Sequence, residues 1–224
     1  MCGFVCLSLV RPPVNTRIWL VRHGEPDNVR GRCYGALDVG LSTTGRSQMA
    51  RVAMRLQAEP LTAIYASSRL RTIESACILA SFHTCGFVED AGLREINFGD
   101  FEGLTYDEIA ARYPALYREW METPKKVRFP NGEDFEQVRR RVLTAFEAIR
   151  RSREGQTVVI VTHGGVIRIL IAWLLQMPDD CLFRLSQDYA AMNLLMWIDG
   201  VPTVQKMNLS AENGAALAET LVGF

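Results

Sequence analysis

The stretch TVVIVTHGGVIR, residues 157–168, joins a short apolar run to a histidine and two glycines. Residues 158–161 are valine and isoleucine only, which is typical of a parallel strand covered on both faces. The glycines end the strand, and the apolar residues from Val166 onward indicate a buried helix. The stretch therefore predicts a strand, a loop that carries His163, and a helix, in that order.

The same order occurs twice earlier in the chain. RIWLV, residues 17–21, indicates a buried strand that ends in RHGEP, and Ser42 can cap the helix that follows. AIYAS, residues 63–67, indicates a second strand. In the helix after it, four residues at helical spacing are expected to face the core: Leu70, Ile73, Cys77 and Ala80. Repeated strand-loop-helix units predict an α/β three-layer sandwich, with a mostly parallel sheet and helices on both faces.

The rest of the chain adds a cover and an antiparallel edge. Residues 92–133 indicate a partly helical insertion over the site, with Thr105 and Glu108 at capping-box spacing and a stop at Pro114. An amphipathic helix follows, with five residues inward: Phe135, Val138, Val142, Phe146 and Ile149. The apolar runs on either side of Gly200 predict a hairpin. We expect an N-terminal extension over 1–16, one domain over 17–208 and a tail over 209–224.

Composition narrows the function. The 224 residues include 48% hydrophobic and 22% charged residues, and 25 basic side chains balance 25 acidic ones. A net charge of zero offers no global field for nucleic acid or a membrane surface, so we expect neither partner. The apolar run 166–175 contains Arg168 and is too short to span a bilayer. Six scattered cysteines show no zinc-like grouping with the three histidines, which favours a reducing cytoplasm and no metal.

The chemistry is expected where three predicted strands end. Arg22 and His23 follow the first strand, Arg71 begins the helix after the second, and His163 follows the last. The carboxyl ends of parallel strands meet at one edge, so these side chains should converge. Arginine forks and histidine donors suit the oxygens of a phosphoryl group. A neutral His23 could attack phosphorus, and Glu95 in the insertion is the leading candidate for the acid and base.

These residues lie in motifs that together resemble the histidine phosphatase superfamily, the phosphoglycerate mutase-like proteins. LVRHGE, residues 20–25, is similar to the R-H-G-E signature of that family. Five further stretches match in the family's order: LSTTGRSQ (41–48), SSRLRTIESA (67–76), LREINFGDFEG (93–103), FPNGEDFEQVRRRV (129–142) and VTHGGVIR (161–168). The resemblance implies a phosphorylated His23, a phosphate pocket completed by Arg22, Arg71 and His163, Glu95 as acid and base, and no cofactor.

The resemblance also bears on the substrate. GRCYGALDVGLS, residues 31–42, looks most like the α-ribazole phosphatase branch, which acts in cobalamin biosynthesis. Asn28 stands one residue earlier than the phosphate-binding asparagine of the family, so we carry it as a candidate phosphate ligand only. The expected function is hydrolysis of a small-molecule phosphomonoester through phosphohistidine. A phosphoglycerate mutase, a broad-specificity sugar-phosphate phosphatase and a non-catalytic phosphate binder stay open as alternatives, as does a homodimer.

Four other residues receive expectations from the sequence. His83 has no companion motif and is interpreted as structural. Cys33 is expected to pack in its loop and Glu25 to order the histidine loop, whereas Arg69 is left open between a substrate contact and a surface position.

Overall fold

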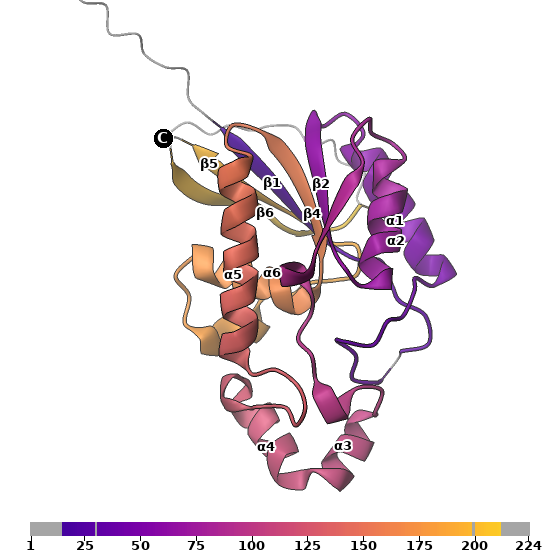
Figure 1. Ribbon diagram of the computed structural model, residues 1–224, viewed down its shortest axis with the longest axis vertical. Coiled ribbons are helices and arrows are strands. Elements are labelled where there is room, and N and C mark those ends of the chain that lie inside the picture. The colour runs from indigo at the N-terminus through magenta and orange to yellow at the C-terminus, as the bar shows by residue number, and fades with distance from the viewer. Residues whose placement is uncertain (1–14, 30, 199, 212–224) are drawn as a thin grey trace, which may run out of the picture.

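The computed structural model describes residues 15–29, 31–198 and 200–211, which form one six-stranded sheet between two layers of helices (Figure 1). The strands are β1 Thr16–Arg22, β2 Leu61–Ser67, β3 Phe87–Asp90, β4 Thr157–Thr162, β5 Met192–Ile198 and β6 Val201–Leu209. They lie in the order β3-β2-β4-β1-β5-β6. The first four strands of that order pair in parallel, and β5 and β6 are antiparallel. The predicted α/β sandwich with a mostly parallel sheet is confirmed.

Helices cover both faces of this sheet. The α-helices of the described residues are α1 Thr43–Leu56, α2 Leu70–Ala80, α3 Tyr106–Arg112, α4 Pro114–Glu122, α5 Phe135–Ser152 and α6 Gly164–Leu174. Trp19 and Val21 of β1 pack in the core on the side of α1 and α2. Ile18 and Leu20 pack in the core on the side of α5 and α6. Successive residues of this central strand thus face opposite layers, and all four are fully buried.

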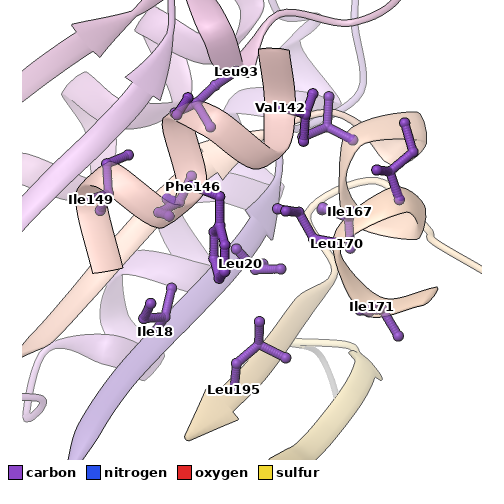
Figure 2. Packing of buried hydrophobic residues seen from close by; sticks show 14 of the residues in the cluster. Ile18, Leu20, Leu93, Val142, Phe146, Ile149, Ile167, Leu170, Ile171 and Leu195 are labelled. Atoms are coloured by element: carbon purple, nitrogen blue, oxygen red, sulfur yellow. The ribbon is translucent and has the colours of Figure 1, made fainter. Parts of the chain in front are cut away.

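The core beneath α5 and α6 is shown in Figure 2. Phe146 and Ile149 of α5 lie over Ile18 and Leu20 of β1, and Leu170 of α6 packs into the same cluster. Burial of each such side chain contributes about 1.5–3 kcal/mol to stability. The inward face predicted for α5 is confirmed at four positions: Val138, Val142, Phe146 and Ile149. The fifth, Phe135, is only partly buried and packs at the edge of the cluster.

The second predicted helix is present, but the expected inward face was wrong. Leu70 is 38% exposed and Cys77 is also exposed. The buried residues of α2 include Arg71, Ser75 and Leu79 instead. Polar side chains can be buried when they find hydrogen-bond partners, and the Ser75 hydroxyl donates to the Arg71 carbonyl at 2.6 Å. The helix is therefore oriented so that Arg71 faces the site at the end of β2.

The insertion forms a cover beyond the carboxyl ends of the parallel strands, at the lower end of the molecule in Figure 1. Thr105 and Glu108 make the predicted capping box at the start of α3. That helix ends at Arg112, as expected, but Pro114 then begins α4, because proline fits the first turn of a helix. The cover has its own small core: Cys33, Phe101, Ile109, Val127 and Phe129. Short 3₁₀ turns complete the fold: η1 Ala91–Leu93, η2 Gly99–Phe101, η3 Pro124–Lys126 and η4 Asp179–Arg184.

The remaining predictions concern the C-terminal hairpin, the apolar run 166–175 and the two ends of the chain. β5 and β6 form the predicted hairpin, and Gly200 in its turn has a φ of +83°. None of the described helices is long and apolar enough to cross a membrane. Most of the predicted extension and tail, residues 1–14 and 212–224, lies outside the described residues, so the proposed domain limits stay a prediction.

Candidate active site

Four basic side chains meet where β1, β2 and β4 end. Arg22 is the last residue of β1 and His23 follows it, while His163 follows β4. Arg71 lies in the first turn of α2, just beyond β2. The rings of His23 and His163 lie edge to face with their centroids 5.2 Å apart. The topology thus brings together residues 22, 71 and 163, as the sequence predicts.

His23 is held in the tautomer that a nucleophile needs. Its Nδ1–H donates to the carbonyl of Gly24 at 2.7 Å, so the lone pair is on Nε2. Burial holds the pKa of His23 well below its ordinary value, and the neighbouring Arg71 and Arg22 guanidinium groups lower it further. The imidazole is therefore neutral near pH 7, with Nε2 able to attack an electrophile.

His163 is also buried and neutral. Its Nε2 shares a hydrogen bond of 2.8 Å with the hydroxyl of Ser67, the last residue of β2. Burial lowers the pKa of His163 well below its ordinary value, and Arg71 and His23 add to the effect. Sequence reasoning did not single out Ser67; its place at the end of a strand that leads to Arg71 was the available signal.

Three buried nitrogens of this cluster have no hydrogen-bond partner among the described residues: Arg22 Nε, Arg71 Nε and His163 Nδ1. The other Arg71 nitrogens donate to the carbonyls of Leu37 and Gly35, both at 2.8 Å. A buried donor without a partner costs about 1–3 kcal/mol. A ligand with several acceptor oxygens and negative charge would satisfy these donors, and a phosphoryl group has both.

Glu95 lies beside this cluster, close to the start of α6. Its Oε2 accepts from the backbone N–H of Gly165 at 3.0 Å, and its Oε1 accepts from the backbone N–H of Ile96 at 3.1 Å. A Cβ at position 165 would push the Glu95 carboxylate away, so glycine allows the carboxylate to keep this position. The carboxyl group is thus held at the rim of the pocket, where it could exchange a proton with a bound molecule.

A cavity of about 140 Å³ opens over His23. Besides the predicted Arg22, Arg71 and Glu95, it is lined by residues that the sequence did not reveal: Arg32, Tyr34, Phe98 and Tyr106. The hydroxyls of Tyr34 and Tyr189 lie 2.6 Å apart, and the Tyr189 ring stacks on the Arg22 guanidinium at 4.1 Å. The cavity also touches Cys33, which packs in the core of the cover, and burial raises the pKa of its thiol.

The remaining candidates lie elsewhere. Asn28 is exposed, has a φ of 54° and does not line the cavity, so its contact with phosphate stays a prediction. Glu25 accepts from the Ser42 hydroxyl at 2.9 Å, consistent with an ordering role. Arg69 is partly buried and does not line the cavity, and His83 follows the far end of α2.

The two buried histidines predict how stability depends on pH. An unfolded histidine gains a proton below its ordinary pKa of about 6.5, whereas folded His23 and His163 do not. Their contribution is therefore present above that pH and lost as the pH falls below it, by up to about 1.4 kcal/mol per pH unit for each histidine. Urea unfolding between pH 7.5 and 5.5 should show this slope.

Two histidine variants show which residue causes this dependence of stability on pH. His163→Gln should unfold with a shallower dependence on pH, whereas His83→Gln should retain most of the slope because His83 is only partly buried. Identical slopes in wild type and His163→Gln would contradict a neutral, buried His163.

Comparisons with known proteins identify the enzyme class as a phosphatase. Residues 18–210 match the model of the histidine phosphatase superfamily (branch 1), and the chain belongs to that family. It is 30% identical over 204 residues to "Phosphoserine phosphatase 1" of Hydrogenobacter thermophilus, covering 91% of this chain and 97% of the relative.

Two solved structures are similar to this fold. "Bacillus stearothermophilus YhfR" has a TM-score of 0.82 and 35% identity, covering 88% of this chain and 98% of that one. The α-ribazole phosphatase from Shigella flexneri has a TM-score of 0.79 and 25% identity, covering 86% and 96%. The similarity therefore spans nearly the whole of both related chains.

Proposed function

We propose that the protein hydrolyses a phosphomonoester through a phosphohistidine on His23. The observation that carries the proposal is the gathering around one neutral histidine of three buried nitrogens without partners: Arg22 Nε, Arg71 Nε and His163 Nδ1. The two arginine N–H groups, and His163 Nδ1–H when its Nε2 accepts from the Ser67 hydroxyl, would hold the phosphoryl oxygens while Nε2 of His23 faces the phosphorus. Positive charge from arginine here stabilises the charge that develops during transfer.

The reaction has two balanced steps. In the first, His23 Nε2 forms a bond to phosphorus as the ester P–O bond breaks, and the carboxylic acid of Glu95 gives its proton to the leaving oxygen. In the second, the Glu95 carboxylate takes a proton from water, the oxygen of that water attacks phosphorus, and the P–N bond breaks. Inorganic phosphate leaves, and both groups return to their starting states.

Within this reaction class we propose α-ribazole 5′-phosphate as the substrate, which would place the enzyme in cobalamin biosynthesis. The stretch 31–42 and the likeness to the Shigella flexneri α-ribazole phosphatase support this choice. A panel of α-ribazole 5′-phosphate, phosphoserine, phosphoglycerates, fructose bisphosphates and an aryl phosphate, compared by kcat/KM, tests it. We expect the highest value for α-ribazole 5′-phosphate.

Phosphoserine is the second candidate substrate, because the relative from Hydrogenobacter thermophilus is named a phosphoserine phosphatase and matches this chain over 97% of its length. A higher kcat/KM for phosphoserine in the same panel would replace the first choice. Transfer of phosphate between phosphoglycerates without release would instead indicate a mutase, and binding without turnover a non-catalytic protein.

We also propose a reducing, cytoplasmic location. The four cysteines of the described residues are free: Cys33, Cys77, Cys85 and Cys181. Disulfides form mainly in oxidising compartments, so free thiols support this location. Microscopy of the full chain with a fluorescent tag at either end would test it.

Activity is expected to survive removal of divalent metals. Arg22 and Arg71 would supply the positive charge that magnesium supplies in many phosphoryl-transfer enzymes, and His163 would add a hydrogen bond to the phosphoryl group. Exhaustive chelation should therefore leave kcat/KM within about twofold of its starting value, because no metal ion takes part in the proposed reaction. Loss of turnover that a divalent ion restores would show that the roles of these three residues are misassigned.

A further inference from the structure

A larger cavity, here called the side cavity, lies against the phosphate site. Its volume is about 540 Å³, and it is bounded by the cover, the start of α5, α6 and η4. It shares three lining residues with the cavity over His23: Glu95, Phe98 and Tyr106. The two cavities are therefore neighbours, with the Glu95 carboxyl group at their junction.

The walls of the side cavity are mainly apolar and aromatic. Trp120 stacks on Tyr106 with ring centroids 5.9 Å apart and an angle of 26°, and it contacts Phe98 at 5.5 Å and Phe129 at 5.3 Å. At η4, Phe183 also lines the cavity and is 67% exposed. Clefts of about 300–1,000 Å³ with apolar walls and few polar groups are typical of small-molecule sites.

The charged residues of the side cavity already have partners. Lys125 pairs with Asp180 at 2.9 Å, and Asp179 approaches Arg139 at 4.0 Å. Arg168 donates from Nε to the carbonyl of Leu185, and its guanidinium lies over the Phe183 ring. Because most of the lining is apolar and aromatic, the cavity suits a neutral, flat group.

We propose that the side cavity binds a neutral aromatic part of the leaving group while the phosphoryl group is held at His23. The inference rests on the proposed function and deepens it by naming the substrate class. With Glu95 at the junction, the bridging oxygen would lie between the phosphate on one side and the aromatic group on the other. A leaving group as short and charged as serine would leave the apolar walls unoccupied. The side cavity thus favours an aromatic phosphomonoester over phosphoserine.

Two substrates with the same type of leaving oxygen test the inference. Ethyl phosphate and 2-(1-naphthyl)ethyl phosphate both release a primary alcohol, so they differ in the aromatic group rather than in the need for an acid. Burying one aromatic group predicts a kcat/KM about 100-fold higher for the naphthyl compound, expressed mainly in KM. Equal kcat/KM values for the two substrates would overturn the inference while hydrolysis itself still stands.

Variants of exposed residues localise the effect without disturbing the core. Phe183→Ala should lower the naphthyl-to-ethyl ratio about tenfold, the order expected from losing one aromatic contact. Leu175→Ala is the matched control, because Leu175 is 48% exposed and lies outside the side cavity. A ratio unchanged in Phe183→Ala, or lowered equally in the control, would contradict the assignment.

A binding measurement separates this inference from the proposed function. Calorimetry of the full chain with 2-(1-naphthyl)ethanol, which has no phosphate, should show binding that weakens about tenfold in Phe183→Ala. If neither ester is hydrolysed and no phosphoenzyme forms, the proposed function fails, yet this binding would still support the side cavity. Absence of binding together with equal kcat/KM values would reject the side cavity alone.

Discussion

Replacing His23 by alanine is expected to abolish turnover, with a loss on the order of 10⁴-fold or more, because the nucleophile is gone and its neighbours act as a unit with it. The change removes the one imidazole whose Nδ1 is tied to the Gly24 carbonyl and whose Nε2 keeps its lone pair. Arg71 and His163 stay buried around the vacant position, so the fold should persist. The largest loss of turnover expected in this protein therefore comes from removing the one nitrogen that forms the bond to phosphorus.

The phosphoenzyme gives a direct measurement. A phosphorus–nitrogen bond on histidine is labile in acid and comparatively stable in base, whereas serine phosphate behaves oppositely. Protein quenched during turnover should carry acid-labile phosphate in wild type and in His83→Ala, the matched histidine control. Label that persists in His23→Ala would contradict the assignment of the nucleophile.

Replacing Glu95 by glutamine should cost about 10²- to 10⁴-fold in kcat, the usual range for a general acid. The loss should be largest for an alkyl phosphate, whose alkoxide leaves poorly without a proton, and smaller for an aryl phosphate. The amide oxygen of glutamine can still accept the hydrogen bond that Gly165 donates to Oε2, and only the hydrogen bond from the Ile96 N–H to Oε1 is lost. The phosphate pocket should therefore survive, and binding of vanadate should change little.

Single-turnover phosphorylation with an alkyl and an aryl substrate separates the two steps. In Glu95→Gln the aryl substrate should give a rapid burst followed by a slow steady state, because no carboxylate remains to activate water. Equal slowing of both substrates would show that Glu95 is a structural carboxylate.

Glu102 offers a matched carboxylate control in the same insertion. Its two oxygens accept from the backbone N–H groups of residues 35, 36, 37 and 98, so it joins the loop before Asp38 to the cover. Glu102→Gln should destabilise that contact without favouring aryl over alkyl substrates. These contacts give Glu102 a positioning role.

Several features could be predicted because they depend on residues close in the chain. The β-branched run before His163 predicted a central strand, and Thr105 with Glu108 predicted a helix start. The rotation of α2 could not be predicted in this way. Apolar spacing favoured Leu70 and Cys77 as inward residues, whereas Arg71 is buried because carbonyls about 35 residues earlier accept its hydrogen bonds.

The α/β class, the three central parallel strands and the four basic residues expected to meet at the strand ends could be predicted from the sequence, whereas the edge strand β3 and the helix α4 could not. Periodicity, glycine positions and motifs are local properties, and parallel pairing places all strand ends at one edge. The contacts of the folded protein were needed to show which donors lack partners, how the Glu95 carboxylate is held and where the side cavity lies. Those properties arise from contacts between segments far apart in the chain, such as Glu95 with Gly165 and Tyr34 with Tyr189. No local pattern encodes such contacts, because they depend on how the cover packs over the completed sheet.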